Sequence, residues 1–259
     1  EKSITRKTKA IVVVHYAGVP CNMDKIVKIG KKYNLFIIED AAQAIFSKYK
    51  NKYCGTIGDI GCFSFHETKN ITSCEGGAII LNKKNFDRKA SIICNKGTDR
   101  EYFNKSLKKY YSWKGLGSSY IPSEITCSIL YSQLINYKKI MKERKKIWIK
   151  YYSTFKNIKS ELLENKTLSA KNIDTNYHMF FLICKNLSTR TKILTELKKI
   201  GVFSAFHYIP LHKSKFGSKY FRKKLTVTEE LSKKIIRLPL WIGVNQNFIL
   251  KKIKKILND

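Results

Sequence analysis

One lysine is notable for its position in the sequence. Lys69 lies within "IGCFSFHETKNITSCEGGAIIL", residues 60–81, between two apolar runs at Cys62–Phe65 and Ala78–Leu81. We expect both runs to be strands, which places Lys69 in a loop that follows a core strand. Burial lowers the pKa of a lysine and frees its amine to attack an aldehyde. The alternative is an ordinary solvated lysine, because only seven of the 51 basic residues are arginine.

A carboxylate that could assist this chemistry ends another apolar run. Leu35–Ile38 reads as a strand, and Asp40 lies at its carboxyl edge. Pyridoxal phosphate (PLP) is an aldehyde cofactor that needs a carboxylate beside its pyridine nitrogen. Ser64, five positions before Lys69, could donate its hydroxyl to the phosphate. Asp40 could equally be the N-cap of a helix through "AAQAIF", and both interpretations stay open.

The elements before Asp40 predict where a ligand would bind. Ala10–Val14 is a β-branched, strand-like run, and a helix from Asn22 or Cys21 to Asn34 connects it to the next strand. This β-α-β unit implies a parallel pair with a right-handed crossover. Ligands in open α/β sheets bind beyond the carboxyl ends of the strands, which is where we expect Asp40.

The second half has a different pattern. Ser123 is a good helix start, and apolar residues recur from there to Phe155 at helical spacing, which predicts one long helix. "NYHMFFLIC" then reads as a strand, "STRTKILTELKKIG" as a helix and "FILKKIKKIL" as a terminal amphipathic helix. We therefore expect a smaller α+β unit at the C-terminal end.

Composition narrows the classes of partner and compartment. The formal charge of +32 could indicate nucleic-acid binding, but the lysines are spread along the chain. We interpret this charge as compositional bias and expect no specific nucleic-acid partner. No run of eighteen apolar residues exists, so we expect no membrane insertion. The seven cysteines form no C-x-x-C pair, which indicates free thiols, no metal site and a reducing, cytoplasmic compartment.

The motifs together resemble a known family. The sequence is similar to the DegT/DnrJ/EryC1/StrS sugar aminotransferases at "IIEDAAQA" and at "GTIGDIGCFSFHETKNITSCEGGAIIL". The similarity continues through "YSWKGLGSSYIPSEI", "NYHMFF", "SAFHYIPLH" and "RLPLWIGV", so it covers nearly the whole chain. The resemblance implies an α/β fold of the PLP-dependent transferase fold type I. Residues 1–126 would be the C-terminal part of the large PLP-binding domain, and residues 127–259 a linking helix and a small domain.

The resemblance also implies roles for particular residues. Lys69 would form the Schiff base with PLP and shuttle the proton, and Asp40 would contact the pyridine nitrogen. Gln43 would contact the ring face or phenolic oxygen. Ser64 would bind the phosphate. Ser119 takes the place of an asparagine that many members contribute across the dimer.

Two histidines complete the expected site. His207 and His212 lie in "FHYIPLH", which approaches the substrate side of the cleft in this family. We expect either one to contact substrate or to be a bonded core histidine. We expect His66 to support the lysine loop.

The implied activity is transfer of an amino group to a nucleotide-linked 4-keto-6-deoxyhexose, with glutamate as the donor and a homodimer as the active form. A related dehydratase is disfavoured, because those enzymes carry histidine where this chain has Lys69. Family members usually have a further N-terminal segment with a phosphate cradle, and we expect its counterpart to be missing here. The alternative is then a truncated, catalytically impaired remnant, with an unpaired strand edge, uncovered apolar faces and poor stability.

Overall fold

The computed structural model describes residues 1–107, 109–158, 160–164, 174–221 and 223–258. The chain divides into two compact units. Unit 1 comprises Glu1–Lys138 and Asp174–Asn176, and unit 2 comprises Lys139–Ile173 and Tyr177–Asp259. The division therefore falls after Lys138, and the domain assignment at residues 126 and 127 stays a prediction.

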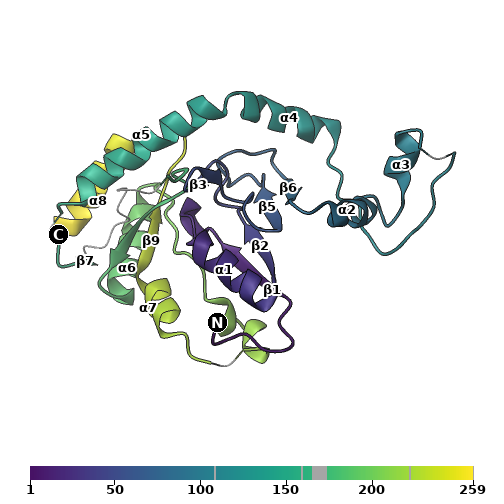
Figure 1. The fold of residues 1–259 in the computed structure, drawn as a ribbon. Coiled ribbons are helices and arrows are strands. Elements are labelled where there is room, and N and C mark those ends of the chain that lie inside the picture. Colours follow the sequence, from purple (N-terminus) through teal and green to yellow (C-terminus); the bar gives the residue numbers. More distant parts are fainter. Residues whose placement is uncertain (108, 159, 165–173, 222, 259) are drawn as a thin grey trace. The chain divides into compact units, whose positions relative to one another are not determined.

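Unit 1 is built on a mostly parallel sheet (Figure 1). Its order is β1-β2-β5-β6, with bounds Ala10–Val14, Phe36–Asp40, Ile60–Ser64 and Gly77–Leu81. The first three strands are parallel and β6 runs antiparallel to β5. This arrangement confirms the expected α/β class. A two-residue-strand hairpin, β3 (Lys48–Tyr49) and β4 (Lys52–Tyr53), lies between β2 and β5 in sequence.

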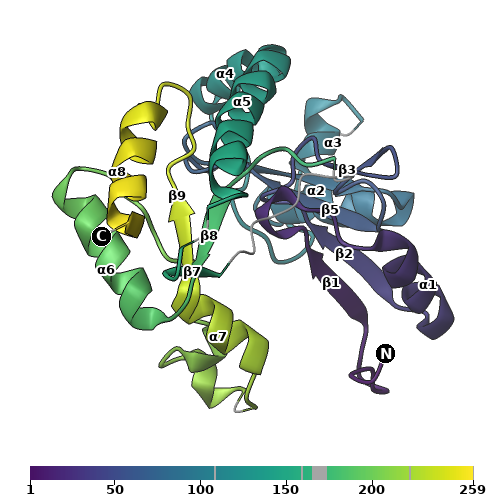
Figure 2. The same ribbon diagram turned by 90° about the vertical axis from the view of Figure 1, so that its left-hand side faces the viewer.

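Helix α1 (Met23–Tyr33) connects β1 to β2 and lies alongside them in both ribbon views (Figures 1 and 2). The Asn22 side chain caps it by accepting a hydrogen bond from the amide of Lys25, and Asn34 ends it in a left-handed conformation. Val13, Met23 and Ile37 form the buried core between the helix and the sheet. The β-α-β unit is therefore as the sequence predicts.

The other face of this sheet carries Asp40. Because side chains alternate along a strand, parallel partners such as Val14 and Asp40 point to the same side, and the packed face carries Val13 and Ile37 instead. On the Asp40 face, Val12 and Val14 of β1 are 61% and 46% exposed. An exposed apolar sheet face thus leads up to the carboxyl end where Asp40 lies.

The structure describes further helices in unit 1. One short helix, η1 (Tyr16–Gly18), follows β1, and four helices come after β6 in the sequence: η2 (Lys84–Phe86), α2 (Asp87–Cys94), α3 (Arg100–Asn104) and α4 (Glu124–Ile135). The prediction of one long helix from Ser123 to Phe155 is wrong, because α4 ends at Ile135 and α5 (Tyr137–Phe155) is a separate helix. Asn136 separates them. Its amide bonds the carbonyl of Gln133 and its side chain donates to Ser132, which closes the last turn of α4.

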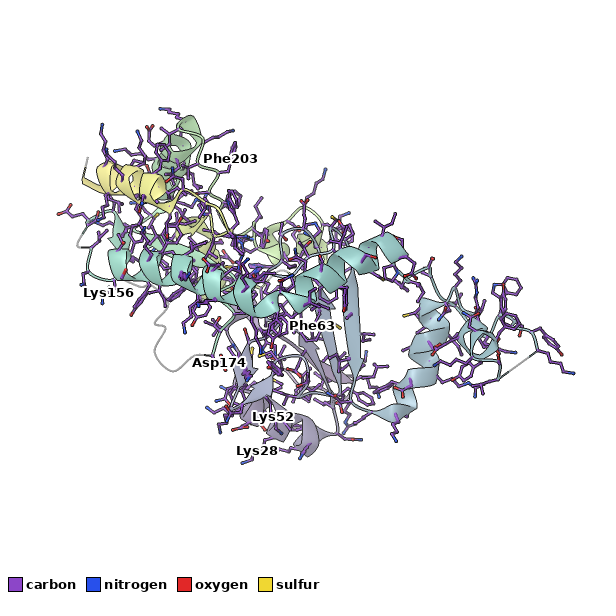
Figure 3. The ribbon with its side chains drawn as sticks, turned by 90° about the horizontal axis from the view of Figure 1, so that it is seen from above. Lys28, Lys52, Phe63, Lys156, Asp174 and Phe203 are labelled. Carbon is purple, nitrogen blue, oxygen red and sulfur yellow. The ribbon has the colours of Figure 1, made fainter. Side chains whose placement is uncertain are left out.

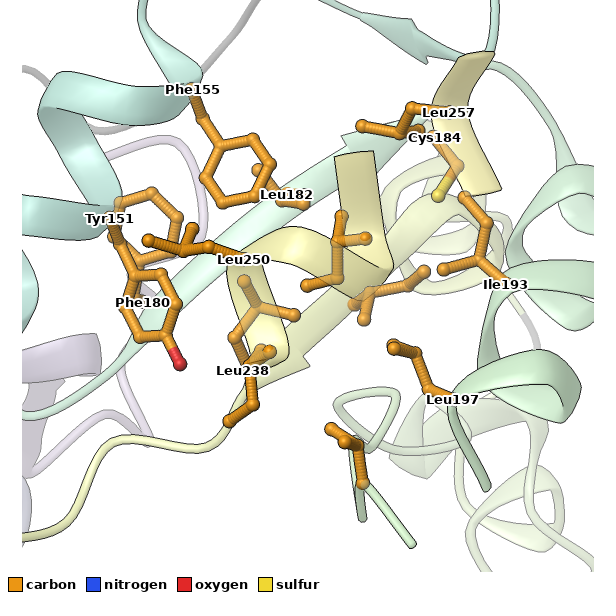
Figure 4. Packing of buried hydrophobic residues seen from close by; sticks show 14 of the residues in the cluster. Tyr151, Phe155, Phe180, Leu182, Cys184, Ile193, Leu197, Leu238, Leu250 and Leu257 are labelled. Atoms are coloured by element: carbon orange, nitrogen blue, oxygen red, sulfur yellow. The ribbon is translucent and has the colours of Figure 1, made fainter. Parts of the chain in front are cut away.

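Unit 2 packs helices on one face of an antiparallel sheet. The sheet order is β7-β8-β9, with bounds Leu163–Glu164, Phe180–Cys184 and Ile235–Leu238. Helices α5, α6 (Leu187–Lys199) and α8 (Gln246–Asn258) bury their apolar side chains against it. Figure 4 shows this core, which includes Tyr151, Phe180, Ile193 and Leu250. The unit also contains α7 (Thr226–Lys234), η3 (Leu211–Lys213) and η4 (Gly217–Lys219).

Most of the excess charge is solvated. Exposed lysines such as Lys28 and Lys52 lie on the surface of unit 1 (Figure 3). In the part of the chain that the structure describes, no helix has the length and apolar character needed to cross a membrane.

Candidate active site

Asp40 is a half-buried carboxylate at the carboxyl end of β2. Its Oδ1 atom accepts a hydrogen bond of 3.0 Å from the amide of Ala42. No helix begins there, since residues 41–46 form turns, so the N-cap alternative is wrong. Among the described residues, no cationic side chain pairs with Asp40. A half-buried carboxylate of this kind is suited to receive a cationic group from a ligand.

Ser64 shares both the edge and the face of Asp40. Asp40 is opposite Cys62 in the parallel β2–β5 pair, and Ser64 lies two residues further along the same side of β5. The negative charge of Asp40 reaches this strand: burial chiefly, and then Asp40, raises the pKa of the Cys62 thiol. Ser64 is half-buried, and its hydroxyl oxygen accepts a long hydrogen bond of 3.4 Å from the amide of His66.

Lys69 is half-buried and lies in the loop between β5 and β6. Its amide donates to the carbonyl of His66 (2.9 Å), which makes a tight turn. His66 shapes this turn further, because its Nδ1 accepts from the amide of Thr68 and contacts the Thr68 hydroxyl at 2.9 Å. The supporting role expected for His66 is therefore confirmed.

The base of the lysine loop is fixed by buried contacts. Ile71 is 0% exposed and Ser73 is 2% exposed. The Phe65 carbonyl accepts from the amide of Ser73 (2.9 Å), and the Phe65 amide donates to the carbonyl of Gly76 (2.8 Å). Gly76 has a φ of +141°, which disfavours any side chain. The loop that carries Lys69 is thus held at both ends.

Gln43 lies in the turns after Asp40 and is half-buried. Its side-chain oxygen accepts a 2.7 Å hydrogen bond from the amide of Ala17, which follows β1. Gln43 is not an exposed helical residue, because no helix forms here. Gln43 therefore connects the ends of β1 and β2 beside the carboxylate.

Glu39 and His15 form a buried pair that the sequence reasoning missed. Both side chains are 0% exposed, and His15 Nε2 lies 2.9 Å from Glu39 Oε2. Because His15 Nδ1 accepts from the amide of Cys21, its Nε2 carries the proton and donates to Glu39. The alternation of β2 contained the signal, since it places Glu39 on the same buried side as Ile37.

Glu39 also accepts three backbone amides from the segment before β5. They are those of Gly55 (2.8 Å), Ile57 (2.6 Å) and Gly58 (2.5 Å). Burial alone would raise the pKa of Glu39, but the hydrogen bonds from His15 and these amides outweigh it and lower the pKa. An ionised Glu39 thereby holds the strand end that carries Asp40.

The other three predicted site residues contact different partners. Ser119 is exposed and pairs with Asn95 after α2. His207, in unit 2, is largely buried and its Nε2 lies 3.2 Å from Arg237. His212 pairs with Glu229 at 3.1 Å, which lowers the pKa of Glu229 to about 2. Their proposed roles toward phosphate and substrate stay predictions, and the Glu229 pair gives His212 a structural partner.

Comparison with known proteins identifies the family. Residues 1–256 match the model of the DegT/DnrJ/EryC1/StrS aminotransferase family, so the chain belongs to that family. Its members are PLP-dependent sugar aminotransferases. The expected family, fold type and cofactor are thereby confirmed.

Individual relatives support this assignment. An uncharacterised protein of Methanocaldococcus jannaschii, MJ1066, is 34% identical over 100% of this chain and 69% of its own length. GDP-perosamine synthase of Escherichia coli O157:H7 is 30% identical over 100% of this chain and 68% of its own. The structure of Helicobacter pylori PseC, an aminotransferase of pseudoaminic acid biosynthesis, matches with a TM-score of 0.89 and 26% identity, covering 99% of this chain and 69% of that one. The chain thus spans about two thirds of these proteins.

The residues present fit this cofactor. Asp40, a half-buried carboxylate without a cationic partner among the described residues, suits a protonated ring nitrogen. Ser64, at the end of β5, lies on the same face of the sheet as Asp40, and Lys69 lies in the loop that follows β5. When bound, PLP supplies an electron sink for the carbon from which a proton is removed.

Proposed function

We propose that this chain transfers an amino group to the keto carbon of a nucleotide-linked 4-keto-6-deoxyhexose. The observation that carries the proposal is the placement of Asp40, Ser64 and Lys69 at the carboxyl end of two adjacent parallel strands. The family membership and the similarity to GDP-perosamine synthase support a nucleotide-sugar substrate.

The particular reaction that we propose is that of a dTDP-4-amino-4,6-dideoxygalactose transaminase, with glutamate as donor. The support is the resemblance of "VVVHYAGVPCNMD", "SFHETKN", "SAFHYIPLH" and "RLPLW" to the enzyme of enterobacterial common antigen synthesis. Such an enzyme works in the cytoplasm and serves lipopolysaccharide or other surface polysaccharide biosynthesis. The amino group leaves glutamate as 2-oxoglutarate forms, and the sugar ketone becomes an amine.

Each site residue has a proposed task. Lys69 would hold the cofactor aldehyde through its Nζ atom until the amine of the donor displaces it, and the freed Nζ would then move a proton between the donor carbon and the cofactor. Asp40 keeps the ring nitrogen protonated, and Ser64 binds the phosphate. Gln43 contacts the ring from the turn beside Asp40. His207 and His212 are proposed contacts for the substrate.

We also propose that the active form is a homodimer in which Ser119 reaches the phosphate of the second copy. The segment around Ser119 supports this, since Trp113, Leu116 and Ile121 are 78%, 95% and 62% exposed. The following helix, α4, buries none of its residues. Its large hydrophobic side chains include Ile125 and Tyr131, which are 75% and 68% exposed. Apolar surface of this kind is typical of a subunit interface.

The test is amino transfer from ¹⁵N-glutamate to a dTDP-linked or GDP-linked 4-keto-6-deoxyhexose, followed by mass spectrometry of the sugar. We expect ¹⁵N in the dTDP-linked product, none with Lys69→Ala, and unchanged incorporation with the control Lys28→Ala, which removes an exposed lysine of the same unit. Incorporation into the GDP-linked sugar alone would overturn the choice of nucleotide. Absence of product with either sugar, in the presence of PLP, would support the impaired remnant.

A further inference from the structure

Asn176 joins the two loops that carry the proposed cofactor residues. It lies far along the sequence but belongs to unit 1, and it is 3% exposed. Its side-chain amide donates to the carbonyls of Gln43 (2.9 Å) and Ile45 (3.0 Å), in the turns that follow Asp40. The side chain of Asn176 is therefore hydrogen-bonded to the turns that follow Asp40.

The backbone of Asn176 contacts the other side of the site. Its carbonyl accepts a buried 2.8 Å hydrogen bond from the side-chain amide of Asn70. Asn70 is the residue directly after Lys69 and is 5% exposed. A single residue thus bonds both the turn after Asp40 and the neighbour of Lys69.

Further hydrogen bonds fix the backbone around Asn176. The amide of Asn176 donates to the Ser47 hydroxyl (3.0 Å), and that hydroxyl donates to the carbonyl of Gly18 (2.7 Å). The Thr175 hydroxyl donates to the same carbonyl at 3.0 Å. A Cβ on Gly18 would lie 2.0 Å from Asn176 Oδ1, so a side chain at position 18 would displace Asn176.

We propose that Asn70 and Asn176 are positioning residues that set the Lys69 amine relative to the Asp40 carboxylate. The inference rests on the proposed function, because it assigns these two amides to the same cofactor site. Neither needs to touch the cofactor. Their buried hydrogen bonds restrict the lysine loop at Asn70 and the carboxylate turn at Gln43, and both restrictions meet at one residue.

The experiment compares Asn70→Ala and Asn176→Ala with a matched control in the full chain. The control is Asn82→Ala, which removes a side-chain amide bonded to the carbonyl of Gly58 at 2.6 Å in the same unit. The first readout is amide hydrogen exchange of residues 65–73 without cofactor. The second is the pH titration of the absorbance of bound pyridoxal phosphate, which reports the charge environment of the bound group.

We expect faster exchange of residues 65–73 in both test variants and not in the control. We also expect the titration midpoint to move by about half a unit or more, since the distance to Asp40 changes. A residue that only stabilises the fold would lower the unfolding midpoint without moving that titration. Unchanged exchange in both variants, or an unchanged midpoint in variants that retain the cofactor, overturns the proposal. If the parent takes up no pyridoxal phosphate at Lys69, the proposed function fails separately, and the exchange readout alone decides whether the two amides hold the loop.

Discussion

Replacing Glu39 by glutamine tests how a buried carboxylate holds the strand end that carries Asp40. Each Glu39 oxygen accepts two hydrogen bonds: Oε1 from Ile57 and Gly58, and Oε2 from His15 and Gly55. The glutamine amide nitrogen must replace one of these oxygens. Whichever oxygen it replaces, the NH₂ group of the glutamine then faces two N–H groups of the protein. Two hydrogen bonds to a charged acceptor are lost.

The magnitude follows from these two bonds. Hydrogen bonds to charged groups contribute about 1.5–3 kcal/mol each, and a neutral amide costs less to bury than a carboxylate, which offsets part of the loss. We therefore expect Glu39→Gln to lower the free energy of unfolding of unit 1 by about 2–4 kcal/mol. The matched control is Glu75→Gln, because Glu75 also pairs with a histidine, His66, at 3.6 Å, but its side chain is 82% exposed. A solvated pair of this kind adds little, so the control should behave as the parent.

The assay is amide hydrogen exchange read at residues 55–58 and, as an internal reference, at Phe180–Cys184 in unit 2. Glu39→Gln should speed exchange of the first segment and leave the second unchanged, while Glu75→Gln should change neither. Equal protection of residues 55–58 in Glu39→Gln and parent would refute the reasoning. It would mean that the carboxylate adds nothing to the network seen around it.

The same carboxylate predicts a pH dependence. Its pKa in the folded chain lies below the ordinary glutamate value of 4.5, so its stabilisation is complete above pH 4.5 and is lost as the pH falls through the folded value. Protection of residues 55–58, corrected for intrinsic exchange, should therefore weaken below pH 4.5 in the parent. Glu39→Gln should lack this component, and an identical acid response in the two proteins would contradict the assignment.

Three further predictions concern single residues. Gly18→Ala should destabilise unit 1 by about 2 kcal/mol or more, since φ is +79° and the new Cβ would lie 2.0 Å from Asn176 Oδ1; unchanged urea denaturation would contradict this. Burial raises the pKa of Cys184 to about 12, so at pH 8 iodoacetamide should label exposed Cys74 and spare Cys184, as read by peptide mass spectrometry. Ile253→Ala, at a fully buried position of the unit 2 core, should cost about 2–5 kcal/mol in urea unfolding followed by tryptophan fluorescence, and a loss well below this range would mean that the core collapses around the gap.

The local part of the fold could be predicted from the sequence because its signals are local. Asn22 and Asn34 flank an amphipathic helix, and they cap α1 as their residue types suggest. The two apolar runs on either side of Lys69 predict its loop after a core strand, and the structure confirms this position. The break between α4 and α5 at Asn136 is not predictable from helix periodicity, since the apolar spacing continues through it and periodicity alone does not show a cap.

The connections within the site could not be predicted in this way. Asn176 meets Asn70 only after the chain has passed through part of unit 2, and nothing near either residue signals the contact. Glu39 is the neighbour of Asp40 at the end of the same apolar run, although alternation sends the two side chains to opposite faces of the sheet. The residues around Asp40 are compatible with both a helix cap and a ligand contact, and only the turns at residues 41–46 exclude the cap.

The central claim is that one lysine among many holds the cofactor. The direct measurement is borohydride reduction of the chain loaded with PLP, followed by digestion and mass spectrometry of every lysine-containing peptide. We predict a phosphopyridoxyl group concentrated on Lys69, and a marked loss of this labelling in Asp40→Asn. Labelling spread evenly over the surface lysines, with no enrichment at Lys69 and no response to Asp40→Asn, would contradict the account.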